Sequence, residues 1–324
     1  MIKMHAHCSI IIVNYNGLKF LKDCLNSLKE TKYKDFEVIL VDNASLDGSA
    51  NYVEKNYPWI KVIRLKKNVG FAIGNIIGFK YATGDYIVLL NNDTIVHEDW
   101  LKELIKTAEM DEKIGIVGAL VIPIKYKGKK PRIISEVTDV ACVIGAAMLI
   151  KRKLIDDVGF FDPDFFIYFE DVELCYKAII SGYRVVFSPN TYVYHVGSGT
   201  MGKGIILQNG TITKNPNVWF KNGKFNKSYY FAIRNQVSMG IKIFNKKYIL
   251  QFLKKPFSVI FHSVLKRNPY QVISGILAII WLSINFGKII VKQQRIQKRK
   301  IYQDEKIFEL LKKQESIYNT LNSL

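Results

Sequence analysis

Residues 86–93 read YIVLLNND, an apolar run suited to a buried strand that ends in two amides and a carboxylate. Asn and Asp are common where strands end, because their side chains bond to the backbone of turns. That ordinary interpretation accounts for Asn91, Asn92 and Asp93 when they are taken alone. A ligand site would require similar polar residues at the ends of other strands, so the remainder of the chain decides between the two interpretations.

Similar apolar runs lie upstream at short spacing, and segments with helical periodicity separate them. Residues 8–13 (CSIIIV), 36–42 (FEVILVD) and 60–65 (IKVIRL) have the continuous apolar character of strands buried on both faces. Further elements are predicted downstream, as helices over 97–110 and 170–181 and as strands over 114–121 and 184–188. Strands that alternate with helices predict an α/β fold with a mostly parallel sheet and helices on both faces.

Polar or small residues recur where the first four predicted strands end. They are Asn14, Asp42 and Asn43, Asn68 and Gly70, and the Asn91 to Asp93 run. Ligands of open parallel sheets bind beyond the carboxyl ends of the strands, where these residues would meet. Asp42 and Asp93 are carboxylates, and Mg²⁺ and Mn²⁺ prefer carboxylate and phosphate oxygens. The rim therefore suits a nucleotide with a hard divalent cation.

Two common nucleotide-binding signatures are missing from the expected places. NYNG follows the first strand instead of GxGxxG, and GxxxxGK[ST] does not occur. NAD enzymes and P-loop NTPases are therefore disfavoured. The four cysteines are far apart, include no CxxC pair and lie in apolar segments, so we expect buried thiols and no zinc site.

Glu170 and Asp171 follow a largely aromatic stretch in FIYFED. One interpretation is a general base held against an apolar wall, where burial adjusts its pKa. The other is that Asp171 caps the helix that begins there, while acidic neighbours favour its positive end. The residues alone leave both interpretations open.

The net charge of +19 is concentrated in the last part of the chain. Residues 1–195 carry 25 Lys and Arg against 24 Asp and Glu, a net charge of +1. Residues 196–324 carry 22 against 4, a net charge of +18. This asymmetry predicts chemistry in the first part and attachment to something anionic in the second.

Five segments, in order along the chain, resemble one known family. They are SIIIVNYNG, VILVDNASLDGS, NVGFAIGN, YIVLLNNDT and the stretch from GAAMLI to YHVGSGT, which together span about residues 8–200. The set resembles the family 2 glycosyltransferases, and within them the rhamnosyltransferase-like group with LNNDT motifs. The resemblance implies a Rossmann-like GT-A fold and inverting transfer of a sugar from a nucleoside-diphosphate donor.

The resemblance also implies roles for single residues. Asp93, in the family's DxD-type motif, and His195 are the expected ligands of Mg²⁺ or Mn²⁺. Asn91 stands where that motif has its first carboxylate, so one charge is lost. Asp171 matches the catalytic base, which outweighs the capping interpretation. The residues expected to bind substrate are Asn14, Asp42, Asn43, Asn68, Gly70, Asn75, Asn91, Asn92, Gly145 and Glu170.

The implied donor is a UDP- or dTDP-sugar, with rhamnose as one candidate, and the acceptor is a hydroxyl of a lipid-linked or cell-surface glycan. Two alternatives belong to other classes. A sugar nucleotidyltransferase would carry a glycine-rich loop with Arg and Lys after the first strand, and NYNG is not such a loop. A nucleic-acid-binding protein would explain the basic tail, but the long apolar runs of the tail argue against it, and we expect no nucleic-acid partner.

The tail contains one stretch near the length of a membrane span, residues 272–291. Both of its flanks are basic, so the charge asymmetry of a single span is missing. We expect in-plane or re-entrant attachment to anionic lipid on the cytoplasmic face, with one true span and a buried helix pair as alternatives. The expected domains are a catalytic unit over 1–215, with donor binding in 8–120 and the acceptor part in 121–215, and a basic helical region over 216–324.

Overall fold

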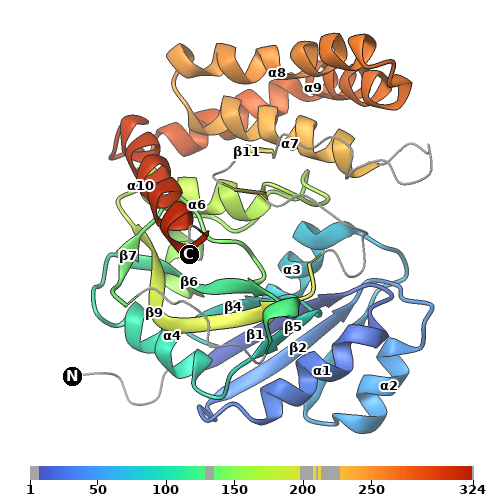
Figure 1. The fold of residues 1–324 in the computed structure, drawn as a ribbon, viewed down its shortest axis with the longest axis vertical. Coiled ribbons are helices and arrows are strands. Elements are labelled where there is room, and N and C mark those ends of the chain that lie inside the picture. Colours follow the sequence, from blue (N-terminus) through green and yellow to red (C-terminus); the bar gives the residue numbers. More distant parts are fainter. Residues whose placement is uncertain (1–6, 128–134, 198–206, 209–210, 213–226, 323–324) are drawn as a thin grey trace.

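The structure is a computed structural model, and it describes residues 7–127, 135–197, 207–208, 211–212 and 227–322. The expected boundary between residues 215 and 216 lies outside the described residues, so this division of the chain remains a prediction. Figure 1 shows a twisted sheet with helices packed against it and a layer of C-terminal helices beyond one face.

The first half of the chain alternates strands and helices, as predicted. Its elements are β1 (Cys8–Asn14), α1 (Leu18–Lys29), β2 (Phe36–Asp42), α2 (Ser49–Asn56), β3 (Ile60–Arg64), α3 (Gly70–Tyr81), β4 (Tyr86–Leu90), β5 (Thr94–Val96) and α4 (Trp100–Ala108). Strands β3, β2, β1 and β4 are parallel neighbours in that order. Their carboxyl ends therefore meet at one edge of the sheet, where the predicted polar residues lie.

The second half of the sheet is mixed, which corrects the expectation of a mostly parallel sheet. Its elements are β6 (Ile114–Pro123), η1 (Ile124–Tyr126), β7 (Thr138–Asp139), β8 (Ala147–Lys151), α5 (Arg152–Val158), α6 (Glu170–Ile180) and β9 (Arg184–His195). Strand β8 lies antiparallel between β4 and β6, and β9 pairs antiparallel with β5 and β7. A strand buried on both faces has the same apolar pattern in either direction, so sequence alone did not reveal this reversal.

Two hydrophobic clusters form the core, one on each face of the sheet. Alternation along β1 places Ile11 in one cluster and Ile10 and Ile12 in the other. Trp100, fully buried in the second cluster, donates its Nε1–H to Thr31 Oγ1 at 3.1 Å. All four cysteines are buried and without disulfides, as expected.

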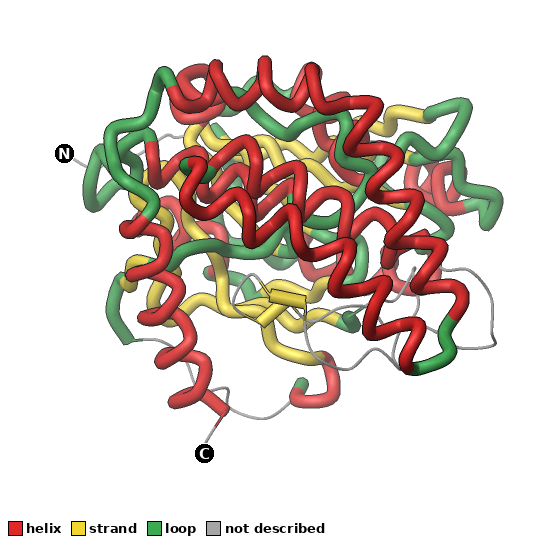
Figure 2. The backbone as a smooth tube through the Cα atoms, turned by 90° about the horizontal axis from the view of Figure 1, so that it is seen from above, coloured by secondary structure: helices red, strands yellow, loops and turns green. Residues whose placement is uncertain are grey.

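Four helices make up most of the described C-terminal region. They are α7 (Lys227–Ile243), α8 (Lys246–Leu265), α9 (Pro269–Gln297) and α10 (Glu305–Asn322), and the short strands β10 (Leu207–Gln208) and β11 (Thr211–Ile212) precede them. Figure 1 shows α7 between the sheet domain and the outer helices α8 and α9, and Figure 2 shows the long helices lying across the sheet. Ile233, Met239 and Ile307 join the cluster that contains Ile11, so the C-terminal helices share the core of the sheet domain.

Candidate active site

The ends of β1, β2 and β4 converge on a hydrogen-bonded polar cluster. The Asn14 amide donates to Ser49 Oγ at 2.8 Å, to Ser45 Oγ at 3.2 Å and to Asp42 Oδ1 at 3.4 Å. Asn92 donates its Nδ2–H to Asn14 Oδ1 at 2.7 Å. The structure thus brings together polar residues from three strands, as the strand ends predicted. Ser45 and Ser49 were not predicted, because serines in a turn have ordinary local uses.

A second group of predicted residues shapes the loop before α3. Asn43 donates to the Gly70 carbonyl at 3.1 Å and accepts from Val69 N–H at 2.8 Å. Asn68 Oδ1 accepts from Gly70 N–H at 2.9 Å. Gly70 has φ +87°, and a Cβ there would lie 2.3 Å from the Phe166 carbonyl oxygen. Only glycine fits this position, which fixes the path of the loop.

Phe71 connects this loop to the second half of the domain, and Asn75 bonds to Phe71 within α3. Phe71 N–H donates to the Phe166 carbonyl at 2.7 Å. The Phe71 ring lies against Gly145, where an added Cβ would be 3.4 Å from Cε1 of the ring. Asn75, which is buried, donates to the Phe71 carbonyl at 2.9 Å, while its Oδ1 has no hydrogen-bond partner among the described residues. The expected donor loop and the expected acceptor part are therefore in direct contact.

The expected metal ligands form a close pair at the end of the sheet. His195 is the last residue of β9 and pairs in register with Thr94 of β5. Its Nε2 lies 2.9 Å from Asp93 Oδ1 and 3.1 Å from Asn91 Nδ2. A buried carboxylate beside an imidazole nitrogen suits Mn²⁺ or Mg²⁺. No group of three or more His, Cys, Asp or Glu suited to a metal occurs among the described residues.

Asp171 lies in the first turn of α6, and two backbone N–H groups, of Gly145 and Val172, donate to its carboxylate. Its Oδ2 accepts from Gly145 N–H at 3.0 Å and its Oδ1 from Val172 N–H at 2.8 Å. Phe169 occupies the N-cap position, and no described side chain caps the helix there. Asp171 therefore does not occupy the N-cap position, although its carboxylate accepts from the first-turn N–H of Val172. Gly145, a predicted site residue, is the direct partner of the predicted base.

Burial raises the pKa of both carboxyl groups at the start of α6. For Asp171, desolvation outweighs the N–H groups of Gly145 and Val172, which lower the pKa. For Glu170, burial comes first, and the charge of Asp171 raises the pKa further. Glu170 Oε2 is buried and has no partner among the described residues, which is the state expected of a protonated carboxyl. Two neighbouring acids with raised pKa values are a common feature of active sites.

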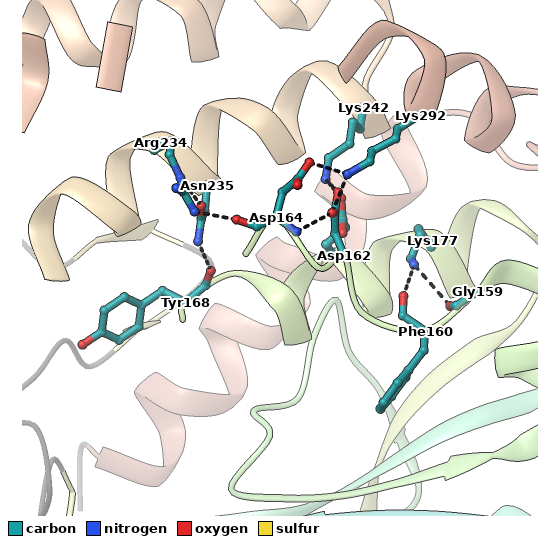
Figure 3. A network of polar contacts seen from close by, with 11 residues as sticks. Gly159, Phe160, Asp162, Asp164, Tyr168, Lys177, Arg234, Asn235, Lys242 and Lys292 are labelled. Carbon is teal, nitrogen blue, oxygen red and sulfur yellow. Dashed lines mark hydrogen bonds and ion pairs between the residues drawn. The ribbon is translucent and has the colours of Figure 1, made fainter. Parts of the chain in front are cut away.

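A polar network, which the sequence did not predict, joins the C-terminal helices to the loop before α6 (Figure 3). From α7, Arg234 and Asn235 reach backbone carbonyls of this loop, and Lys242 pairs with Asp162 at 2.6 Å. From α9, Lys292 pairs with Asp162 at 2.6 Å. The one signal in the sequence was the run RNQ inside an otherwise largely apolar helix. A polar run at fully buried helical positions implies partners elsewhere in the fold.

Comparison with known families agrees with this geometry. The profile described as glycosyl transferase family 2 matches residues 9–158, and that of glycosyl transferase family group 2 matches residues 131–286. The chain belongs to the family 2 glycosyltransferases. Its fold is the GT-A fold expected from the sequence. Neither profile distinguishes the rhamnosyltransferase-like group, which remains a prediction.

Curated relatives of this glycosyltransferase include the poly-beta-1,6-N-acetyl-D-glucosamine synthase of Staphylococcus aureus, 26% identical over 213 residues. That match covers 60% of this chain and 51% of the synthase. An uncharacterized protein, y4gI of Sinorhizobium fredii, is 26% identical over 227 residues, covering 60% of this chain and 25% of y4gI. The chain thus spans about half, or less, of the curated relatives it matches.

Solved structures show the same fold at low sequence identity. S. aureus TarS 1–349 in complex with UDP-GlcNAc has a TM-score of 0.56 and 16% identity, covering 97% of this chain and 92% of TarS 1–349. GalNAc-T7 with UDP, GalNAc and Mn²⁺ has a TM-score of 0.59 and 16% identity, and the match covers 88% of this chain and 58% of GalNAc-T7. The mannosyltransferase PcManGT of Pyrobaculum calidifontis with GDP-Man and Mn²⁺ has a TM-score of 0.51 and 15% identity. That match covers 92% of this chain and 86% of PcManGT.

Proposed function

We propose that this protein transfers a sugar from a nucleoside-diphosphate donor to an acceptor hydroxyl, with inversion at the anomeric carbon. One observation carries the proposal. The buried carboxylate of Asp171 accepts from Gly145 N–H, and Gly145 lies against the ring of Phe71, which follows the loop that borders the polar rim of the sheet. A base beside a nucleotide rim is what direct displacement of a diphosphate requires.

The donor occupies the carboxyl ends of the parallel strands. Asp42 and Asn43 would receive the base and ribose of a UDP- or dTDP-sugar, and the loop at Gly70 would lie beside the nucleotide. The complexes of TarS with UDP-GlcNAc and of PcManGT with GDP-Man support a nucleotide-sugar donor in this fold. Rhamnose is proposed as one transferred sugar because of the LNNDT motif.

Asp93 and His195 would hold a divalent cation, Mg²⁺ or Mn²⁺. The pairing of their side chains at 2.9 Å and their burial support this assignment. When bound, the cation would offset the charge of the leaving diphosphate. Asn91, in place of a carboxylate, lies beside the same nitrogen, with its Nδ2 3.1 Å from His195 Nε2.

Asp171 would accept the proton of the attacking acceptor hydroxyl. Its raised pKa makes the carboxylate a stronger base than an exposed Asp. The hydroxyl oxygen then bonds to the anomeric carbon from the face opposite the diphosphate, and the bond from carbon to the diphosphate oxygen breaks. One displacement inverts the configuration and requires no covalent intermediate with the protein.

The outer helices would attach the enzyme to the cytoplasmic face of a membrane, near a lipid-linked acceptor. Among the described residues, one helix, Pro269–Gln297, is long and apolar enough to span a bilayer, with a mean hydropathy of 1.8. It packs one face on α7 and α8, through Ala278, Leu282 and Ile289. Its other face and α8 expose large apolar side chains, among them Phe257, Phe261, Ile273, Ile276, Ile280 and Phe286. This pattern favours in-plane attachment, and the net charge of the tail favours anionic lipid.

The proposal is tested by incubating the protein with UDP-, dTDP- and GDP-sugars and measuring released nucleoside diphosphate. We expect release from at least one donor, stimulation by Mn²⁺ or Mg²⁺ and loss in EDTA. If no donor binds or is consumed with either cation, while the protein is folded and at a membrane, the proposed function is wrong.

A further inference from the structure

Two residues in a rare backbone conformation lead directly into the start of α6. Tyr168 has φ +74° and Phe169 has φ +71°, and both are residues with large side chains. Such residues seldom adopt the left-handed region, and they remain there only when the surrounding structure holds them. The next two residues are Glu170 and Asp171. The direction in which α6 begins, and with it the position of the Asp171 carboxylate, therefore depends on whatever holds this loop.

Asn235 of α7 is the side chain that holds the strained loop (Figure 3). It is fully buried, and its Nδ2 donates to the carbonyls of Ile167 and Tyr168 at 2.9 Å each. Arg234 Nε donates to Asn235 Oδ1 at 2.9 Å. Because a guanidinium can only donate, this bond fixes which end of the amide faces the loop. Arg234 itself donates to the Asp164 carbonyl at 2.6 Å.

Gln314 of α10 holds the other backbone segment that contacts Asp171. Its Oε1 accepts from Ala141 N–H at 3.0 Å and from Cys142 N–H at 3.1 Å. Its Nε2 donates to the Cys142 carbonyl at 2.8 Å, and the side chain is only 2% exposed. This segment continues to Gly145, whose N–H donates to Asp171. A long-range amide contact thus fixes one of the two N–H donors of the carboxylate.

We infer that Asn235 and Gln314 are positioning residues for the base, so that the C-terminal helices complete the active site as well as attach the protein. The inference rests on the proposed function for Asp171. Each amide satisfies backbone groups at a segment adjoining the carboxylate, partly buried carbonyls for Asn235 and buried groups for Gln314. The ion pairs of Asp162 with Lys242 of α7 and Lys292 of α9 brace the same loop that Asn235 holds.

The test compares Asn235→Asp and Gln314→Met with matched substitutions at Gln271. Gln271, on α9, is 3% exposed and bonds through its side chain to Ser263, away from the loop. Gln271→Glu makes the same amide-to-carboxylate change as Asn235→Asp, and Gln271→Met matches Gln314→Met. A general cost of removing a buried amide would appear equally in the controls.

Hydrogen exchange gives a readout that does not need activity. We expect exchange to rise about tenfold at residues 167–172 in Asn235→Asp and at residues 141–145 in Gln314→Met, with neither segment changed in the controls. Sugar transfer to acceptor should fall roughly 10²-fold in both variants, because small misplacements of reacting groups carry such costs. The KM for the donor should stay at the wild-type value.

The pH profile separates positioning from loss of fold. The Gly145 N–H lowers the pKa of Asp171, so its displacement in Gln314→Met should move the acidic limb of transfer to higher pH. Among the described residues, the titratable groups near Asp171 are Glu170, Cys142 and Cys175, and none of them is substituted. The Gln314 side chain lowers the pKa of the buried Cys142 thiol, so its loss raises that pKa further and leaves the thiol neutral. Unchanged exchange and unchanged transfer in both variants would overturn the inference. A wild-type protein that consumes no donor would instead refute the proposed function. The hydrogen-exchange data would still test whether Asn235 and Gln314 hold the segments around Asp171.

Discussion

At the scale of single residues, the proposed chemistry depends on two buried acids with different surroundings. Asp171 has two N–H donors that favour its charged form, whereas Glu170 has an oxygen without a partner among the described residues. The pair therefore separates into one carboxylate suited to accept a proton and one acid that favours the protonated form. This difference supports Asp171 as the proposed base.

Replacing the base should remove transfer but not donor binding. Asp171→Asn keeps the shape of the side chain but cannot accept the acceptor proton, so turnover should fall about 10²–10⁴-fold. Donor affinity measured by calorimetry should match that of the wild type. Full transfer by a folded Asp171→Asn protein would remove Asp171 from the mechanism.

Glu170→Gln should stabilise the protein at neutral pH. The pKa of Glu170 is raised in the folded state, so folding takes up a proton, and stability falls as pH rises from the ordinary value of 4.5 toward the raised value. The variant removes that loss. Its melting temperature should exceed that of the wild type at pH 8, and the difference should shrink toward pH 4. A wild-type advantage at both pH values would show that Glu170 is not buried as a protonated acid.

Asp93→Ala should abolish the response to divalent cations. The variant leaves His195 alone at the site, so Mn²⁺ should no longer stimulate turnover, and donor binding should weaken. Titrating Mn²⁺ against turnover of both proteins measures this effect. Asp99→Ala, at an exposed ion pair with Lys32, is a control that should leave the titration unchanged. Equal stimulation of the wild type and Asp93→Ala would place the cation elsewhere.

At the scale of elements, local pattern predicted strands and helices but not their long-range pairing. The bounds of β2 coincide with the predicted 36–42, and α4 falls within the predicted 97–110. Strand β9 runs to His195 instead of ending at 188, because it also pairs with β5, a short strand without a sequence signal of its own. Site residues at strand ends were predictable since parallel topology gathers them, whereas Asn235 and Gln314 meet partners 67 to 173 residues away.

Lys242 should be essential to the packing of α7 on the loop before α6. Its side chain is 1% exposed, and its ammonium pairs with Asp162 and Glu173. Burial alone would raise the pKa of Asp162, but the charges and hydrogen bonds of Lys242 and Lys292 outweigh burial and lower that pKa. Lys242→Met should therefore cost about 3–5 kcal/mol of unfolding free energy in urea.

Lys247→Met provides the matched control for that experiment. Lys247 is 75% exposed, and its pairing distance to Glu305 is 4.0 Å, so its loss should cost about 0–1 kcal/mol. Adding Glu173→Gln to Lys242→Met should recover part of the stability by removing the carboxylate that has lost its ion pair, whereas Asp162 keeps its pair with Lys292. Equal costs for the Lys242 and Lys247 variants would contradict the buried ion-pair account.

At the scale of the whole molecule, one shared core connects the proposed nucleotide rim and base to the C-terminal helices, which carry the apolar outer surface. In liposome flotation, the protein should bind anionic vesicles, lose part of that binding in moderate salt, and be released by alkaline carbonate. Phe257→Glu with Phe261→Glu should weaken binding more than tenfold, because burying each ring is worth about 1.5–3 kcal/mol.

Met110→Glu is the control for that surface, since Met110 is 55% exposed but lies after α4, on the sheet domain. Its binding to vesicles should equal that of the wild type. Release by detergent alone would indicate that Pro269–Gln297 spans the bilayer, and a protein that ignores anionic vesicles would rule out membrane attachment by α8 and α9.

The central claim is that the bond between the sugar and the diphosphate breaks at this rim. Phosphorus NMR of a reaction with nucleotide-sugar donor, acceptor and Mn²⁺ identifies the bond directly. We expect nucleoside diphosphate as the phosphorus product, formed by the wild type and not by Asp171→Asn when acceptor is present. Sugar 1-phosphate with a nucleoside monophosphate would show cleavage within the diphosphate and contradict glycosyl transfer.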